Sequence, residues 1–230
     1  MRNYAWLAGG AAIALLAATP AAAEPEIGAV FEREYRGAEG TRVSGELREL
    51  RWGNAVFTEE TVRTESGEST ELEFLDSTRL RVGSNSEVVL DRFVYDPAQG
   101  TGDAVITFGK GVFRFVSGDM QNKEGYKLVT PAATLEIRGT IFRLIIDAAN
   151  NVLLFVEEGA VAVIYCGGET EVIEAGSSGL AYGNCSGGGI RTGDITSDHP
   201  AQDQRDDDSG VSKGPPGGQS ENDNDNDNQG

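Results

Sequence analysis

The sequence predicts an all-β domain, with a sandwich, a jelly roll and a short solenoid-like fold as alternatives, followed by a disordered acidic tail. From residue 24 to about residue 190, short segments rich in β-branched and aromatic residues are separated by turns that contain Gly, Asn or Asp. Helical periodicity is nearly absent from this stretch, and from residue 191 onward few apolar residues remain. We therefore expect a signal peptide at 1–23, the β domain at 24–190 and the tail at 191–230.

The first 23 residues have the pattern of an export signal. Arg2 supplies the positive charge, an apolar run extends from Ala5 to Ala18, and small residues precede Glu24. The apolar run is shorter than a membrane-spanning helix needs, so we favour cleavage after Ala23 over an uncleaved anchor. The mature chain is then expected to lack a transmembrane segment and to be periplasmic or secreted.

Strands are expected wherever an alternating or apolar run lies between two turn signals, such as the turns at 83–85 and 109–110. The segment 31–35 is only weakly marked. The strand that starts at Tyr126 should end at Thr130 and Pro131, because proline cannot continue a strand ladder. The other expected strands are 44–50, 56–64, 70–75, 79–82, 87–93, 105–108, 111–116, 134–137, 141–146, 152–157, 160–166, 170–174 and 180–184.

Two of these segments carry adjacent apolar residues without alternation. Ile141–Ile146 and Val152–Val156 are therefore expected at the centre of the core, covered on both faces. The strands at 70–75 and 79–82 alternate charged with apolar residues, which predicts that one of their faces is exposed to water.

The chain is strongly acidic, with 37 acidic and 19 basic residues and a formal charge of −18. Loss of Arg2 with the signal peptide would change this charge to −19. The basic residues are scattered among acidic ones, so the sequence argues against nucleic acid as a partner and against adsorption on an anionic membrane.

The sequence offers no recognisable catalytic constellation. Its one histidine, His199, lies in the tail, which rules out a Ser-His-Asp or Cys-His arrangement in the β domain. The zinc ligands are too few, and no phosphate-binding glycine loop precedes a helix. Glu157 and Glu158 could in principle act as a glycosidase pair, but beside Gly159 a solvated edge is favoured. We expect no enzyme and no cofactor.

Cys166 and Cys185 are the only cysteines and are the candidate disulfide of an exported protein. A strand meander would bring both to the same end of the sheet. In a flat sheet the first and third strands lie about 9.5 Å apart, beyond disulfide reach, so the bridge requires the third strand to curl over. Two separate reduced thiols are the alternative.

The tail ends in alternating Asn and Asp residues. Asp223–Asn228 begins like a calcium-binding loop, but Asn228 stands where the sharp turn of such a loop needs Gly. Weak and non-specific cation binding by a solvated acidic segment is favoured, and no metal site is expected.

The most distinctive segment extends from Tyr126 to Leu144. It contains a strand break followed by a glycine that predicts a bulge or a close backbone approach. The pattern consists of Thr130, Pro131, Ala133, Arg138, Gly139, Thr140 and Phe142. It resembles the signature of FecR-type periplasmic domains, and the resemblance covers roughly Leu50 to Val163. These residues are interpreted as structural, with Arg138 pinning the strand break through a carboxylate or backbone carbonyls rather than contacting a ligand.

The resemblance implies an all-β interaction domain in the periplasm. In the regulatory members of the family, one transmembrane helix ties the domain to a cytoplasmic segment that binds a sigma factor, and the domain senses an outer-membrane receptor. This sequence shows neither that segment nor that helix, so we expect the interaction role without sigma-factor regulation.

The expected function is therefore that of an exported, non-enzymatic interaction or sensing module with a protein partner in the cell envelope. A glycan-binding or glycan-processing module is the first alternative, and Trp52, Tyr95 and Tyr126 are its candidate aromatic residues. The second alternative is a structural or adhesive secreted protein that associates with itself through an exposed sheet edge.

Overall fold

The computed structural model describes residues 24–31, 37–122, 125–186 and 188–192. The predicted signal peptide and nearly all of the predicted tail lie outside these residues. In the described part of the chain every regular element is a strand, so the predicted all-β class is confirmed. The strands are β1 (Glu26–Val30), β2 (Glu39–Thr41), β3 (Leu47–Glu49), β4 (Ala55–Phe57), β5 (Glu60–Arg63), β6 (Thr70–Phe74), β7 (Arg79–Val82), β8 (Glu87–Asp96), β9 (Thr101–Phe108), β10 (Gly111–Val116), β11 (Tyr126–Val129), β12 (Ala133–Ile146), β13 (Val152–Tyr165), β14 (Thr170–Glu174), β15 (Ser177–Ala181) and β16 (Gly188–Thr192).

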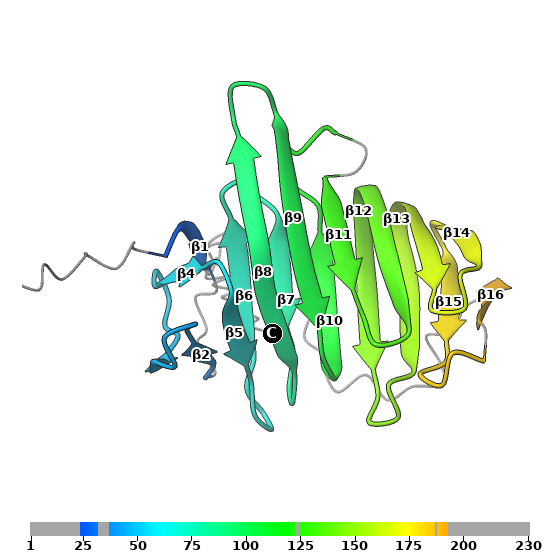
Figure 1. Ribbon diagram of the computed structural model, residues 1–230, viewed down its shortest axis with the longest axis horizontal. Coiled ribbons are helices and arrows are strands. Elements are labelled where there is room, and N and C mark those ends of the chain that lie inside the picture. The colour runs from blue at the N-terminus through cyan, green and yellow to red at the C-terminus, as the bar shows by residue number, and fades with distance from the viewer. Residues whose placement is uncertain (1–23, 32–36, 123–124, 187, 193–230) are drawn as a thin grey trace, which may run out of the picture.

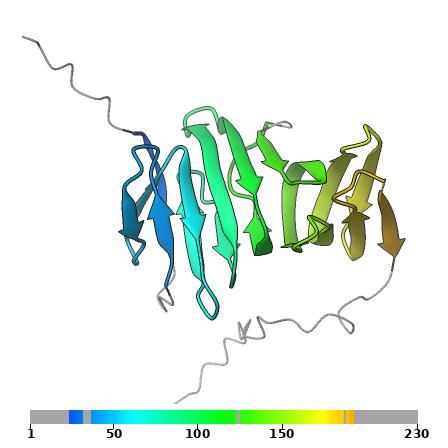
Figure 2. The same cartoon turned by 60° about the horizontal axis from the view of Figure 1, so that its bottom comes forward.

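All sixteen strands of the described residues belong to one hydrogen-bonded sheet, which curls into a half-barrel. The strands follow one another along the long axis of the molecule (Figure 1, Figure 2), and the β8–β9 hairpin projects beyond its neighbours. The pairing is antiparallel except between β9 and β11. The all-β class that the sequence predicts thus takes the form of one curled sheet.

The long hairpin of β12 and β13 divides the sheet into two halves. The first half-sheet has the order β3-β2-β5-β8-β9-β11 and continues through Ala133–Arg138 of β12, Ala160–Tyr165 of β13, and β14. The second half-sheet has the order β4-β1-β6-β7-β10 and continues through Ile141–Ile146 of β12, Val152–Glu158 of β13, β15 and β16. Register shifts between Arg138 and Phe142 mark the bend.

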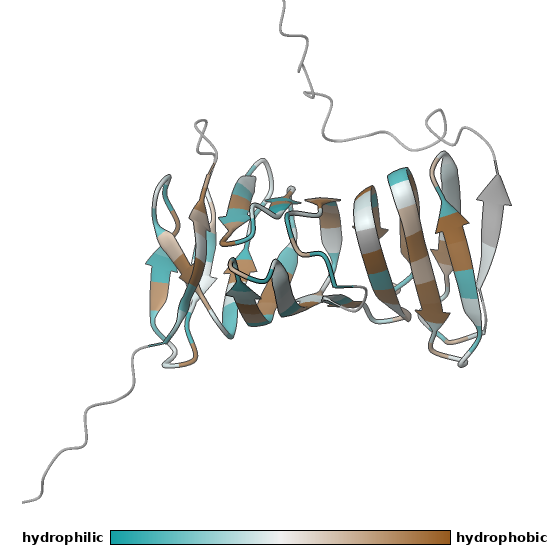
Figure 3. Cartoon of the chain, turned by 90° about the horizontal axis from the view of Figure 1, so that it is seen from above, coloured by the Kyte–Doolittle hydropathy of each residue, from teal (hydrophilic) through white to brown (hydrophobic). Residues whose placement is uncertain are grey.

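The core lies between the two half-sheets, because aromatic residues of one half contact those of the other. Phe74 of β6 stacks on Phe93 of β8 with ring centroids 5.0 Å apart, and Phe113 of β10 meets Phe108 of β9 at 4.8 Å. Figure 3 shows hydrophobic and hydrophilic residues alternating along the strands, as expected where one face of each strand is buried. Each half-sheet therefore has an inner apolar face and an outer face.

At two places the sequence predicts that a strand ends, but glycines with positive φ bend the strand there instead. The expected pairs 134–137 with 141–146 and 152–157 with 160–166 are single strands, β12 and β13, each of 14 residues. Gly139 (φ +57°) and Gly159 (φ +74°) adopt the left-handed backbone conformation at the bend, where the pairing of β12 with β13 is irregular. Conversely, the expected strand 56–64 is two strands, β4 and β5, because Glu59 adopts φ +62° in a turn.

The expectation that Ile141–Ile146 and Val152–Val156 are covered on both faces is wrong. Only every second residue of these segments is buried, namely Phe142, Leu144, Ile146, Val152, Leu154 and Val156. The intervening apolar residues point to the outer face of the second half-sheet and stay partly exposed. The apolar runs thus create an outer surface that is richer in aliphatic side chains than a solvated sheet face requires.

Candidate interaction surface

Three arginines lie side by side on the outer face of the second half-sheet. Arg114 of β10 is paired directly with Arg81 of β7 on one side and with Arg143 of β12 on the other. We call Arg81, Arg114 and Arg143 the arginine row. Like charges at directly paired positions destabilise a sheet, so this arrangement is not explained by strand pairing alone.

One carboxylate bridges two members of the row. Glu157 of β13 accepts hydrogen bonds from Arg143 Nε at 2.6 Å and from an Arg114 terminal nitrogen at 3.1 Å. Burial raises the pKa of Glu157, but the hydrogen bonds and charges of Arg143 and Arg114 outweigh it, so the pKa lies below its usual value. The arginine side chains nevertheless stay open to solvent, at 37% for Arg114 and 45% for Arg143.

Aliphatic side chains flank the arginine row on both sides. One flank is the directly paired series Val112, Ile145, Leu153 and Leu180, which crosses β10, β12, β13 and β15. The other flank is the pair of Val116 and Ile141. All six are partly exposed. We call the arginine row, Glu157, Phe155 and these six residues the arginine face.

Aromatic rings stand at both ends of the row. Phe155 is paired with Arg143, whose guanidinium lies 5.7 Å from the centre of the ring. At the other end, Glu71 faces Arg81, and the backbone N–H of Phe31 donates to the Glu71 carbonyl. The Phe31 ring is 41% exposed and lies 4.3 Å beneath the guanidinium of Arg79. Arginine and aromatic residues set among aliphatic ones are the composition of energetically dominant protein–protein contacts.

The arrangement of these residues in a row could not be predicted from the sequence. Alternation in 70–75 and 79–82 correctly predicts an outer face for Glu71, Glu73, Arg79 and Arg81. The row depends on the register between β7, β10 and β12, which are separated along the chain by loops of different length. An available signal was the surplus of apolar residues in Ile141–Ile146, since only one face of that strand is needed for the core.

A buried polar network joins the half-sheets near their middle. The Tyr126 hydroxyl of β11 contacts the carboxylate of Asp76, which follows β6, and lies 2.8 Å from Thr78 Oγ1. Asp76 also accepts the backbone N–H and the hydroxyl of Thr78, both at 2.9 Å. The backbone N–H of Gly118 donates to Thr78 Oγ1 at 2.9 Å and to the Tyr126 oxygen at 3.2 Å. The four groups satisfy one another, which indicates a structural role.

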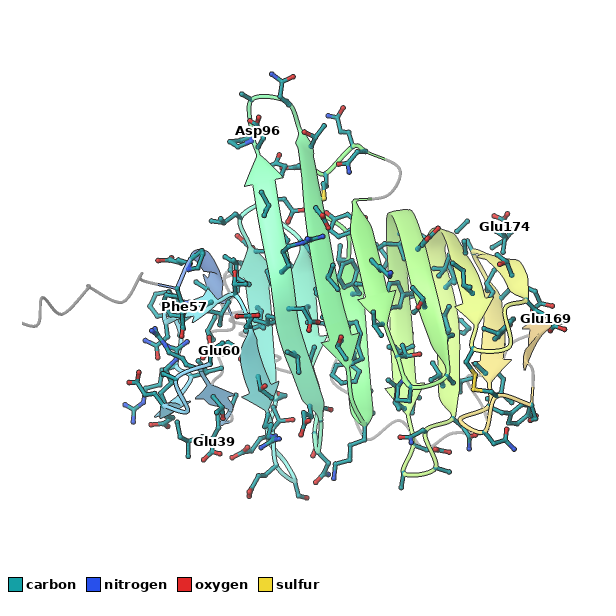
Figure 4. The ribbon with its side chains drawn as sticks, in the orientation of Figure 1. Glu39, Phe57, Glu60, Asp96, Glu169 and Glu174 are labelled. Atoms are coloured by element: carbon teal, nitrogen blue, oxygen red, sulfur yellow. A yellow bond between two sulfur atoms is a disulfide. The ribbon has the colours of Figure 1, made fainter. Side chains whose placement is uncertain are left out.

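Each end of the curled sheet carries its own link between the halves. At one end, Arg48 of β3 forms two hydrogen bonds of 2.8 Å with the buried carboxylate of Glu60 and donates to the Ala55 carbonyl of β4 at 2.6 Å. Glu60 also accepts the N–H of Phe57, and both residues lie at the β2 and β4 end in Figure 4. At the opposite end the structure places a disulfide between Cys166, which follows β13, and Cys185, between β15 and β16; their Cα atoms are 5.4 Å apart.

The residues of the distinctive 130–142 segment lie at bends and in the core. Thr130 turns the chain between β11 and β12, where its hydroxyl bonds both to the N–H and to the carbonyl of Ala133. Pro131 is exposed in that turn. Thr140 donates its backbone N–H to Ser117 Oγ and its hydroxyl to the Ala160 carbonyl. Phe142 is fully buried and stacks on Phe115 at 5.3 Å. The side chain of Arg138 lies outside the described residues.

The other candidate groups are not brought together into a site. Glu157 belongs to the arginine face, while Glu158 is exposed at the bend of β13. Trp52 is 65% exposed in the turn before β4, whereas Tyr126 is buried, so these aromatic residues do not line one groove with Tyr95 of β8. His199 and Asp223–Asn228 lie outside the described residues. In the described ranges, no group of three or more His, Cys, Asp or Glu side chains is placed to hold a metal ion.

Comparisons with known proteins give one family. A family model described as FecR protein matches residues 60–162, from the start of β5 into β13. Two crystal structures of a candidate anti-sigma factor from Parabacteroides distasonis, at 1.65 and 2.50 Å resolution, are similar at 14% identity and a TM-score of 0.47. Each match covers 58% of this chain and 60% of that chain, so it spans less than two thirds of the solved protein. None of the curated proteins matches the chain.

Proposed function

We propose, starting from the FecR domain that residues 60–162 form, that this chain is an exported, non-enzymatic interaction or sensing module of the cell envelope. Its partner is a protein, and the arginine face is the surface that binds it. The observation that carries the proposal is the arginine row itself, which keeps three like charges in adjacent strands among exposed aliphatic side chains.

The composition of the arginine face supports a protein partner. Flat contact surfaces between proteins combine an apolar centre with arginine and aromatic residues, and Arg can bind carboxylates through two hydrogen bonds at once. A solvated sheet face has no need for Val112, Ile145, Leu153 and Leu180 at paired positions. An acidic partner surface with aliphatic side chains around its carboxylates would complement both parts of this face.

Export and the absence of catalysis rest on the sequence. The first 23 residues carry the signal-peptide pattern, and the only histidine, His199, lies in the acidic tail outside the predicted β domain. Within the described residues, no helix has the length and apolar character needed to cross a membrane. N-terminal sequencing of the chain recovered from the periplasmic fraction should begin at Glu24. Recovery of a chain that keeps residues 1–23 would contradict export with cleavage.

Photo-crosslinking in intact cells tests the interaction surface. A photoreactive residue at Leu153 of the full chain should capture one dominant envelope protein. The double variant Arg114→Glu with Arg143→Glu should reduce this capture at least tenfold, because it reverses the charge at the centre of the face. A matched control, Arg92→Glu with Lys127→Glu, reverses two charges on the outer face of the first half-sheet and should leave capture unchanged.

Three outcomes would overturn the proposal. Equal capture by the wild type and by the Arg114→Glu, Arg143→Glu variant would remove the arginine face from the contact. Recovery of glycan fragments in place of a protein would favour a glycan-binding module. Hydrolysis of an envelope polymer by the purified chain would contradict the non-enzymatic role. Thermal unfolding of every variant, followed by circular dichroism, checks that each one is folded.

A further inference from the structure

We infer that the acidic segment 193–230 of the same chain docks on the arginine face and competes there with the partner. This inference rests on the proposed function, because it assigns a regulator to the same surface. The argument uses the distribution of charge, the point where the described chain ends, and the length of chain that follows it.

Charge makes the arginine face the favourable docking place for this segment. Residues 193–230 contain ten acidic and two basic residues, and residues 24–192 contain 27 acidic and 16 basic residues. The β domain as a whole therefore repels the segment, and only a local excess of positive charge can attract it. The arginine row supplies such an excess, since Arg114 and Arg143 share the single carboxylate of Glu157, while Arg81 lies opposite Glu71.

The chain leaves the sheet on the correct half. β16 ends at Thr192 and is the last strand of the second half-sheet, beyond β15, β13, β12 and β10 in turn. Neighbouring strands are about 4.8 Å apart, so β10 and its Arg114 lie roughly 19 Å from β16 across the sheet. No passage around an edge to the other half-sheet is required.

The first acidic run lies at a matching distance along the chain. Asp206, Asp207 and Asp208 follow Thr192 by about 15 residues. A chain of the unstructured type that the composition predicts has a root-mean-square span of about 20 Å over that length. A tether whose span matches the distance gives an effective concentration in the millimolar range, so individually weak Asp–Arg contacts can compete with a partner in solution.

The aliphatic flanks explain why the segment would act as a competitor and not as a permanent cover. Residues 193–230 include few apolar side chains, so they can neutralise the arginine row but cannot bury Val112, Ile145, Leu153 and Leu180. A partner that has both carboxylates and apolar residues also gains the free energy of burying these aliphatic side chains. Docking of the segment should therefore depend on ionic strength more strongly than partner binding does.

The test uses the purified full chain without any partner, so that its result is independent of the proposed function. A photoreactive residue at Ile145 on the arginine face should crosslink to peptides of 193–230, at least fivefold more than one at Val129 on the outer face of the first half-sheet. The yield should not change with protein concentration, since the contact is within one chain. Raising the salt concentration from 0.05 to about 1 M, where the Debye length is near 3 Å, should abolish it.

A variant of the full chain with fewer acidic residues in 193–230 separates electrostatic attraction from simple proximity. Replacement of Asp206, Asp207, Asp208, Asp223, Asp225 and Asp227 by Asn should lower the Ile145 crosslinks to the level of the Val129 control. In intact cells the same variant should capture more partner through Leu153 than the wild type does. Equal crosslinking from Ile145 and Val129, or crosslinks that survive the Asn replacements, would overturn the inference even if the partner is found. Failure to find a partner while the crosslinks behave as expected would instead count against the proposed function.

Discussion

The hydroxyl of Tyr126 reaches from β11 of the first half-sheet to Asp76 and Thr78 beside β6 and β7 of the second. Burial, followed by the hydrogen bond to Asp76, raises the pKa of Tyr126 well above its ordinary value. The tyrosine therefore stays protonated in the folded protein at pH values where it ionises in the unfolded chain. Its contribution to stability is complete below about pH 10 and is lost as the pH rises further.

Replacing Tyr126 by Phe tests this network. The change leaves the buried carboxylate of Asp76 with one donor fewer, so the free energy of unfolding should fall by about 1–3 kcal/mol at pH 7. The loss of stability between pH 9 and about pH 11 should also be smaller in the variant than in the wild type. Urea denaturation at each pH measures both. Tyr182→Phe, at a side chain that is 42% exposed, is the control and should change stability by less than about 0.5 kcal/mol.

The sequence predicted which side chains are buried better than it predicted which side chains form hydrogen bonds with each other. The family pattern and the apolar neighbours of Phe142 indicated a core residue, and Phe142 is fully buried. The role of Asp76 could not be predicted, because its partner Tyr126 is 50 residues away along the chain. Hydrogen bonds across the core depend on how the two halves face each other, and no local pattern contains that information.

At the scale of elements, the β12–β13 hairpin determines the curl of the sheet. It crosses both half-sheets, and its two glycines with positive φ lie next to each other at the bend. A Cβ atom on Gly159 would lie 2.3 Å from the carbonyl oxygen of Gly139, which is fixed in the backbone. Glycine is thus required at 159 both by the left-handed conformation and by the close approach of the neighbouring strand.

Gly159→Ala should consequently destabilise the protein more than an alanine that meets only backbone strain. Gly168 has φ +90° in the β13–β14 turn, and a Cβ atom there would have no neighbour within 4 Å. Gly168→Ala should lower the free energy of unfolding by about 1–2 kcal/mol, because alanine is strained in the left-handed conformation. Gly159→Ala should lower the free energy of unfolding by more than this, because the two strands must also separate. Thermal and urea unfolding of both variants give the comparison, and equal losses would argue against the close approach as a constraint.

The elements show where sequence patterns are sufficient and where they are not. Arg79–Val82, Gly111–Val116 and Thr170–Glu174 were predicted with their observed bounds, because each lies between clear turn residues. At Gly139 of β12 the sequence predicted a bulge or a close backbone approach, and the register shift there agrees with it. The bend of β13 at Gly159 was instead mistaken for a turn, since a glycine in a strand run indicates a bulge and a reversal equally well. The arginine face was missed for a related reason: it is a property of strand register, which the turns between β7, β10 and β12 do not specify.

At the scale of the whole molecule, a curled sheet that does not close needs links between its halves. The Arg48–Glu60 pair serves one end, the Cys166–Cys185 disulfide the other, and the Tyr126 network the middle. The Glu60 side chain is fully buried, while 20% of the Arg48 side chain is exposed. Removal of one partner from such a pair leaves the other charge buried without an opposite charge. The resulting loss of stability is larger than the net stability that the intact pair contributes.

Glu60→Gln should therefore open one end of the molecule selectively. We expect the free energy of unfolding to fall by up to about 3 kcal/mol. This lies at the low end of the range for removing one partner of a buried pair, because Arg48 keeps some contact with solvent. Amide hydrogen exchange should accelerate in β1, β3 and β4 and stay unchanged in β12 and β13. Glu49→Gln, which removes the exposed pair with Arg51, is the control and should alter neither quantity appreciably. Faster exchange throughout the sheet would show that the pair stabilises the molecule globally.

The fixed position of the arginine row also bears on how quickly a partner can bind. Its three guanidinium groups project from adjacent hydrogen-bonded strands of one sheet, whose two ends are held by the Arg48–Glu60 pair and the Cys166–Cys185 disulfide, so the surface has little backbone freedom to lose. A partner should meet it as a rigid body, with an association rate constant that falls as salt is added and with little reordering of the backbone. Charge-reversing substitutions at Arg81 or Arg143 are then expected to slow the encounter itself, whereas substitutions at Leu153 should mainly shorten the lifetime of the complex.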